Sequence, residues 1–317
     1  MIERLRDDTL NLMKIPGLSG HEDKVRDYIK EAVKKIGLTP TFDKLGNLTI
    51  TFPGTSPRVM LFTHMDQLGL VVRKIEDDGY LRFERVGGVP EKILLGQNIS
   101  VIAKNGKELS GIIGTKSHHA TQPDEKYKVP SYRDLYIDLG LRTASEVRAN
   151  GIDIGSPIVY KPSAEVIGDE KIIGTSVDDR AGCAVLLEVA RQINSRAAGP
   201  EINIVFTVQE EFNLRGALPV AQKIKPEIAI QIDLLLASDT PDMRDFGEIK
   251  LGEGPGISMF SFHGRGTLNG VIPHPVLVKH FEQAASKENI NLQKSAHIGA
   301  LTDLSYVQLV ENGVASM

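Results

Sequence analysis

The feature that most constrains the fold is a set of short, uninterrupted apolar runs that alternate with segments of helical periodicity. Residues 58–63, 201–208 and 227–232 each form an apolar run of the length of one strand. Continuous hydrophobicity is typical of strands that are covered on both faces. Helices are expected between and beside these strands, over 181–196 and 216–223. This alternation predicts an α/β/α sandwich around a largely parallel sheet, of the phosphorylase/hydrolase-like kind.

The N-terminal segment predicts helices followed by a strand. Ser19 and Glu22 have the spacing of a capping box, in which each side chain satisfies a free backbone donor at a helix start. Apolar residues then recur at helical spacing over 25–36, and Gly37 is a natural stop. Residues 47–52 carry β-branched and aromatic side chains and read as a strand.

The sequence pattern changes over residues 71–161, where short strand-like runs replace long helical periodicity. These runs are separated by glycine turns, and Asn105-Gly106 between apolar runs is a hairpin signal. We therefore predict a small all-β insertion domain, barrel-like, over 71–161. The catalytic domain is then discontinuous, formed by 1–70 and 162–317.

Composition excludes several classes of function. The chain has 317 residues, 41% of them hydrophobic, so it can bury a sizeable core, and its net charge of −4 offers no basic field for nucleic acid or an anionic membrane. No segment approaches the roughly 18 apolar residues of a membrane helix, and the first residues lack a signal-peptide core. The single cysteine, Cys183, excludes internal disulfides and zinc sites built on several thiolates. We expect a cytoplasmic enzyme whose metal, if any, is held by His, Asp and Glu.

Two polar pairs lie where strands and helices meet. His64 and Asp66 follow the run 58–63, and residues two apart share a face of a strand. A carboxylate that accepts a hydrogen bond from one imidazole nitrogen leaves the other free for a metal; a strand-end histidine with a turn aspartate is the equally weighted alternative. Asp178 and Asp179 precede the helix 181–196. One aspartate there reads as a helix cap, but two adjacent carboxylates repel unless a cation holds them.

Acids also follow the next two strands. Glu210 and Glu211 come directly after the run 201–208. Adjacent acids at the end of a buried strand are costly without a counter-charge, so we prefer a functional pair over two solvated loop acids. One of the two can bind metal while the other carries a proton. Asp233 interrupts an apolar run and is either a turn residue or a ligand.

These segments together supply one imidazole and several carboxylates from strand ends, where sites form in open α/β sheets. Such ligands suit Zn, Co or Mn. Two ions that share a carboxylate would lie roughly 3.5–4 Å apart, would lower the pKa of a water and would polarise a carbonyl. An unligated glutamate then takes the water proton and returns it to the leaving amine.

At these residues the sequence resembles the TET-type metallo-aminopeptidases, a family of dinuclear enzymes that includes glutamyl aminopeptidases and relatives named endo-1,4-glucanases or cellulases. The similarity runs over nearly the whole chain, in order and in spacing. The matching segments are HMDQLG at 64–69, SVDDRAG at 176–182, VQEEFNLRGA at 208–217, IQID at 230–233, SDTP at 238–241, GPG at 254–256 and GALTD at 299–303.

The resemblance implies a role for each matching residue. His64, Asp178, Glu211 and Asp233 would be metal ligands, with Asp178 bridging two divalent ions. Glu210 would be the general base and acid, and Asp66 would orient His64. The resemblance also implies a cis peptide between Asp178 and Asp179, and assembly through the β insertion into dimers and hollow tetrahedral dodecamers that admit short peptides.

One departure from the family bears on the second metal site. The family places a further histidine ligand after another strand, beyond the segment that aligns with 311–316, and this sequence ends at Met317. We therefore expect the site of Asp178 and Asp233 to lack its imidazole, and the site of His64, Asp178 and Glu211 to be complete.

Three functions follow as hypotheses. The first is a metal-dependent aminopeptidase acting on short peptides. The second is a glycoside hydrolase, which needs two carboxylates roughly 5–9.5 Å apart across a sugar; adjacent Glu210 and Glu211 and the absence of Trp argue against it. The third is a degenerate, non-catalytic assembly subunit that holds one metal or none.

Overall fold

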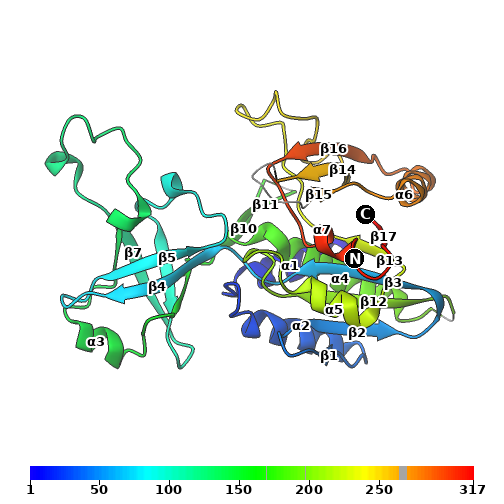
Figure 1. Cartoon of the computed structure of the whole chain (residues 1–317), viewed down its shortest axis with the longest axis horizontal. Helices are drawn as coiled ribbons and strands as arrows, with labels where there is room; N and C mark the ends of the chain where they lie inside the picture. The colour runs from blue at the N-terminus through cyan, green and yellow to red at the C-terminus, as the bar shows by residue number, and fades with distance from the viewer. Residues whose placement is uncertain (169, 197, 264–269) are drawn as a thin grey trace.

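The chain folds into an α/β part and a projecting arm that carries a closed β-barrel (Figure 1). The computed structural model describes residues 1–168, 170–196, 198–263 and 270–317. The predicted fold class, an α/β architecture with an inserted all-β domain, is confirmed.

The α/β part is built on a six-stranded sheet with the order β1-β2-β12-β3-β13-β17. The four strands β12, β3, β13 and β17 run parallel, while β2 is antiparallel to β12 and β1 to β2. The sheet is therefore largely parallel, as predicted. Its strands are β1 (Thr41–Phe42), β2 (Leu48–Phe52), β3 (Thr55–His64), β12 (Pro200–Thr207), β13 (Ile228–Gln231) and β17 (Ala315–Ser316).

Helices cover both faces of this sheet. Successive side chains of a strand point to opposite faces, so an apolar strand packs against a helical layer on each side. In β12, Ile204 and Phe206 pack with one helical layer, and Val205 between them packs with the other. The first layer consists of α1 (Ile2–Met13), α2 (Asp23–Lys35) and α4 (Val177–Ile193), and the second of α5 (Ala217–Ile224) and α7 (Leu304–Val307).

A smaller unit is drawn above the six-stranded sheet in Figure 1. Its three strands have the order β15-β14-β16, and β14 and β16 run parallel. It consists of β14 (Gly256–Phe262), β15 (Gly270–Val271), α6 (Pro275–Lys287) and β16 (Gln293–Ile298).

The barrel has its own hydrophobic core and the closed strand order β4-β5-β8-β7-β6-β9. The predicted Asn105-Gly106 hairpin joins β6 to β7, and Gly106 has the positive φ of +80° that such a turn requires. The elements are β4 (Gly69–Ile75), β5 (Leu81–Val86), η1 (Glu91–Ile93), β6 (Asn98–Ile102), β7 (Glu108–Gly114), η2 (His118–Ala120), η3 (Tyr132–Asp134), β8 (Tyr136–Asp138), α3 (Ala144–Ala149) and β9 (Pro157–Tyr160). A hairpin of β10 (Ala164–Ile167) and β11 (Lys171–Gly174) leads back to the α/β part.

The predicted capping box of Ser19 and Glu22 is wrong. Helix α2 begins at Asp23, so Glu22 occupies the N-cap position, where its side chain makes no capping hydrogen bond. The hydroxyl of Ser19 donates instead to Asp66, and the carboxylate of Glu22 accepts from the backbone of Gln209. Both side chains therefore face the sheet end and not the helix.

Among the residues described, no helix is both long enough and apolar enough to cross a membrane.

Candidate active site

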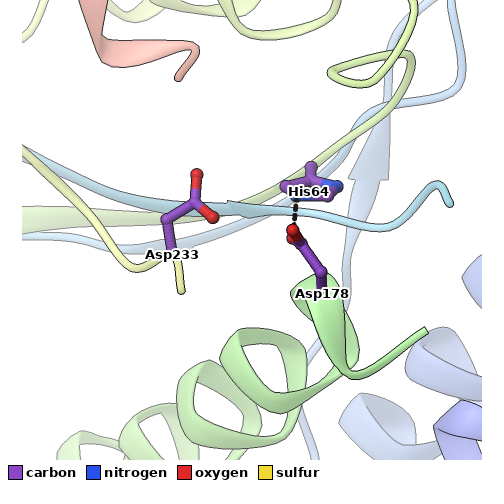
Figure 2. Close-up of side chains that lie close together, drawn as sticks. All are labelled: His64, Asp178 and Asp233. Atoms are coloured by element: carbon purple, nitrogen blue, oxygen red, sulfur yellow. Dashed lines mark hydrogen bonds and ion pairs between the residues drawn. The ribbon is translucent and has the colours of Figure 1, made fainter. Parts of the chain in front are cut away.

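Three side chains that are far apart in the sequence meet at the carboxyl end of the parallel strands. His64 is the last residue of β3, Asp233 follows β13 by two residues, and Asp178 lies in the first turn of α4. One ligand atom from each lies within 4.8 Å of the other two. Figure 2 shows the carboxylates of Asp178 and Asp233 directed toward the imidazole. Sites of this kind form where parallel strands end.

The imidazole of His64 lies between two aspartates. Its Nε2 lies 3.0 Å from Oδ1 of Asp178, and its Nδ1 lies 3.4 Å from Oδ1 of Asp66. The ring is almost fully buried, and the thiol of Cys183 donates to the backbone carbonyl of His64 at 3.2 Å. This arrangement leaves Nε2 on the side of Asp178 and Asp233, the side on which a metal would bind.

The two adjacent aspartates at the start of α4 have opposite environments. Asp179 is fully buried and accepts hydrogen bonds from the hydroxyl of Thr63 and the amide of Gly182, whereas the side chain of Asp178 is 52% exposed. The peptide bond between them is cis, as the resemblance implied. Only Asp178 therefore faces the cluster, and Asp179 anchors the turn to β3.

Asp66 organises the segment that carries the two glutamates. Its Oδ1 accepts the amide of Glu210 at 3.0 Å, and its Oδ2 accepts the amide of Glu211 at 3.1 Å. Glu210 is buried, and its Oε2 lies 4.0 Å from Nε2 of His64. Glu211 is half-buried and lies outside the three-residue cluster of His64, Asp178 and Asp233.

Burial and mutual repulsion dominate the electrostatics of this site. Burial is the main cause that raises the pKa of Glu211 to about 8, of Asp303 to about 7 and of Asp233 to about 6. Burial also raises the pKa of Glu210 well above its ordinary value. Burial alone would lower the pKa of His64, but the charge of Glu210 and the neighbouring aspartates outweigh it and raise that pKa.

This donor set fits a divalent cation. Several carboxyls are buried together, which is costly unless a positive charge compensates them. One imidazole with carboxylate oxygens is a ligand set that suits Zn, Co or Mn. His64, Asp178 and Asp233 are the residues that could hold such an ion.

Two residues of the site were not identified from the sequence. Asp303 is fully buried and accepts the hydroxyl of Thr207 at 3.1 Å, and within the described residues its Oδ1 has no hydrogen-bond partner. Gln231, in β13, donates to Oδ2 of Asp233 at 3.0 Å. Asp303 lies in the GALTD segment that carried part of the resemblance, but four residues separate it from the end of β16, so no apolar strand marked it.

Comparison with known proteins agrees with this geometry. Residues 46–317 match the model of the family described as M42 glutamyl aminopeptidase. The chain is 35% identical to the putative aminopeptidase SgcX of Escherichia coli (strain K12), over 98% of this chain and 84% of that protein.

Solved structures with the same fold include two that are named as TET peptidases and one that is named as an endoglucanase. The TET aminopeptidase of a marine sediment Thaumarchaeota archaeon superposes with a TM-score of 0.91 at 31% identity, over 99% of this chain and 87% of that one. The TET1 peptidase of Pyrococcus horikoshii, which can assemble into a tetrahedron or a large octahedral shell, superposes with a TM-score of 0.83 at 30% identity, over 96% and 86%. An endoglucanase from Thermotoga maritima is similar too, with a TM-score of 0.71 at 31% identity, over 91% and 83%. By its sequence and its fold the chain belongs to the M42 glutamyl aminopeptidase family and is a hydrolase of the metallo-aminopeptidase class.

Proposed function

We propose that the chain is a metal-dependent aminopeptidase that hydrolyses the N-terminal peptide bond of short peptides. The observation that supports this most directly is the convergence of His64, Asp178 and Asp233, with ligand atoms within 4.8 Å, beside the buried carboxyl of Glu210. An acid–base group placed next to a cation-binding cluster is the arrangement that metal-assisted hydrolysis requires.

The metal ligands proposed for this activity are His64, Asp178, Glu211 and Asp233, with Asp178 shared between two divalent ions. Zn and Co are the ions that we propose, and Mn is an alternative. The charge of Asp178 is the second cause, after burial, of the raised pKa of Glu211, which supports a place for Glu211 beside the cluster. When bound, the cations would polarise the scissile carbonyl and acidify a water.

Glu210 is the proposed proton carrier. Its Oε2 lies 4.0 Å from Nε2 of His64, and its side chain is only 9% exposed, so bulk water has little access to the carboxyl group. It would accept the proton of the attacking water and hand it to the leaving amine. Asp66 would orient His64 by facing Nδ1, so that Nε2 keeps its direction, and it also accepts the backbone amides of Glu210 and Glu211.

The substitution Glu210→Gln tests this assignment. It keeps the size of the side chain and removes the proton acceptor, so kcat on aminoacyl-p-nitroanilides with added Co or Zn should fall by roughly 10²–10⁴. The metal content, measured by emission spectroscopy, should stay that of the unmodified chain. Glu31→Gln, an exposed change on α2, is the matched control and should leave kcat unchanged.

Two other outcomes would replace the proposal. Release of reducing sugar from a β-glucan in the presence of a chelator would identify a glycoside hydrolase, because that chemistry needs no metal. The chain would instead be an assembly subunit if, after incubation with Co or Zn, it hydrolyses none of a broad panel of aminoacyl substrates and holds one ion or none per subunit.

We further propose a cytoplasmic homo-oligomer, either a dimer or a tetrahedral dodecamer, that forms through residues 71–161 as a dimerisation domain. Residues 1–70 and 162–317 would be the catalytic domain. Tyr127 and Val129 in the barrel arm are exposed apolar side chains, 92% and 54% accessible, of the kind that an interface covers. Sedimentation velocity should give a mass that is a multiple of the monomer. A monomer at micromolar concentration would contradict assembly.

A further inference from the structure

The turn over residues 17–22 contacts two segments of the candidate active site, the one that follows His64 and the one that carries Glu210. Its backbone joins the sheet end: Leu18 forms a parallel bridge with Gln67, and the amide of Gln67 donates to the carbonyl of Gly17 at 3.0 Å. The side chain of Gln67 closes the pairing, because its Oε1 accepts the amide of Gly17 at 3.1 Å. This turn is therefore fixed to the stretch that follows His64.

Two side chains of this turn reach the machinery around Glu210. The hydroxyl of Ser19 donates to Oδ2 of Asp66 at 2.5 Å, on the same oxygen that accepts the amide of Glu211. Oε1 of Glu22 accepts the amide of Gln209 at 3.1 Å and the amide of Gly20 at 2.7 Å. Glu22 is only 4% exposed, so these contacts form away from bulk water.

The segment that they support has little regular structure of its own. Residues 208–210 follow the end of β12 and belong to no helix or strand. Gln209 has a φ of +56°, a left-handed conformation that residues other than glycine adopt only when their surroundings hold them. The three consecutive amides of Gln209, Glu210 and Glu211 all donate to carboxylates, the first to Glu22 and the others to Asp66.

We propose that Ser19 and Glu22 are positioning residues that hold the backbone of residues 209–211, and so present the side chain of Glu210 to the cluster of His64, Asp178 and Asp233. The proposal rests on the proposed role of Glu210 for its effect on catalysis. Its structural part, the restraint of the 209–211 backbone, does not depend on any activity.

The variants Glu22→Ala and Glu22→Gln separate positioning from a general structural role. Both backbone amides donate to Oε1 alone, so a glutamine amide oxygen at that place can accept both, whereas alanine can accept neither. We expect Glu22→Ala to lower kcat on an aminoacyl-p-nitroanilide by about 10- to 100-fold, with KM and metal content unchanged. Glu22→Gln should restore kcat to within about threefold of the unmodified chain, because an uncharged acceptor makes weaker hydrogen bonds than a charged one.

Amide hydrogen exchange supplies a readout that needs no activity. In metal-loaded protein, peptides covering 208–214 should exchange about fivefold faster in Glu22→Ala, as expected for one lost hydrogen bond, and at the unmodified rate in Glu22→Gln. Ser19→Ala, which removes a single hydroxyl, should give a smaller change in the same peptides. Asp138→Ala, which removes a carboxylate that accepts the amide of Gly140 at 2.7 Å in the barrel, is the matched control and should leave these peptides and kcat unchanged.

Each result either supports or overturns the proposed role of Ser19 and Glu22. Unchanged exchange over 208–214 in both Glu22→Ala and Ser19→Ala overturns the proposal, whatever the activity. Equal losses of kcat in Glu22→Ala and Glu22→Gln also overturn it, as does a loss of metal in proportion to the loss of kcat. If the unmodified chain hydrolyses no substrate while exchange accelerates only in the variants without the acceptor, the proposed function fails and the restraint of 209–211 stands.

Discussion

Gln231 joins the proposed metal-binding cluster of His64, Asp178 and Asp233 to the loop before α7. Its amide nitrogen donates to Oδ2 of Asp233 at 3.0 Å, and its amide oxygen accepts the amide of Leu304 at 2.7 Å and the hydroxyl of Thr302. A side chain that orients a metal-binding carboxylate in this way usually contributes 10- to 100-fold in metal affinity. The cluster should therefore depend on a residue that would itself touch no ion.

We expect Gln231→Met to weaken the binding of Zn or Co by about 10- to 100-fold, because methionine keeps the volume and loses the donor to Asp233. Isothermal titration of the metal-free protein measures this directly. Gln293→Met is the matched control, since Gln293 also bridges backbone groups, those of Lys250 and Gly254, and neither residue belongs to the cluster. Equal metal affinity in all three proteins would contradict the role of Gln231.

At the same scale, the sequence was informative where a polar residue ends an apolar strand. His64 and Asp233 could be placed together because the strands before them are parallel neighbours, β3 and β13. The argument from spacing was wrong for Ser19 and Glu22, because a spacing of three residues fits both a capping box and a turn that reaches across to another segment. Hydrogen bonds between residues separated by 47 or more positions leave no local pattern.

At the scale of elements, a bidentate ion pair between Arg4 and Glu188 connects α1 to α4. The guanidinium of Arg4 donates to both oxygens of Glu188, through Nε at 2.9 Å and Nη2 at 2.7 Å. The hydrogen bond from Arg4 is the first cause that lowers the pKa of Glu188 to about 2, from an ordinary 4.5, although burial opposes it. Arg191 adds a further contact from within α4, at 3.3 Å.

This pair predicts a pH-dependent contribution to stability. Because the folded pKa is lower than the unfolded one, the contribution is fully present above about pH 4.5 and is lost as the pH falls toward 2. We expect Glu188→Gln to lower Tm by roughly 2–4 °C at pH 6, and the difference from the unmodified chain to shrink on going to pH 3. Thermal unfolding at several pH values measures it. Glu31→Gln, on the exposed side of α2, should give no such converging difference.

The local sequence pattern predicted which helices and strands exist more accurately than it predicted the residues at which they begin and end. The helix expected over 181–196 is α4 (Val177–Ile193), and the strand expected over 227–232 is β13 (Ile228–Gln231). Asp178 and Asp179 have non-helical backbone angles and contact β3, so the regular part of α4 begins only after them, close to the predicted start. Contacts between distant segments decide such ends, and a local pattern does not contain them.

At the scale of the whole molecule, the barrel and the α/β part have separate hydrophobic cores. Ile137 in β8 and Ile204 in β12 are both fully buried, one in each part. Replacing a buried isoleucine by alanine costs about 2–5 kcal/mol through lost burial and the cavity that remains. The same chemical change can therefore be made in each core and its consequences compared.

We expect Ile137→Ala to accelerate amide exchange throughout the barrel while metal affinity at the cluster stays unchanged, because no barrel strand supplies His64, Asp178 or Asp233. Ile204→Ala should weaken metal binding as well, since β12 pairs with β3 along its length up to His64 and leads directly to Glu210. Exchange by mass spectrometry and metal titration on the same preparations compare the two. If Ile137→Ala lowered metal affinity as much as Ile204→Ala, the two cores would have to unfold as one unit, and the barrel would stabilise the site and not merely extend from it.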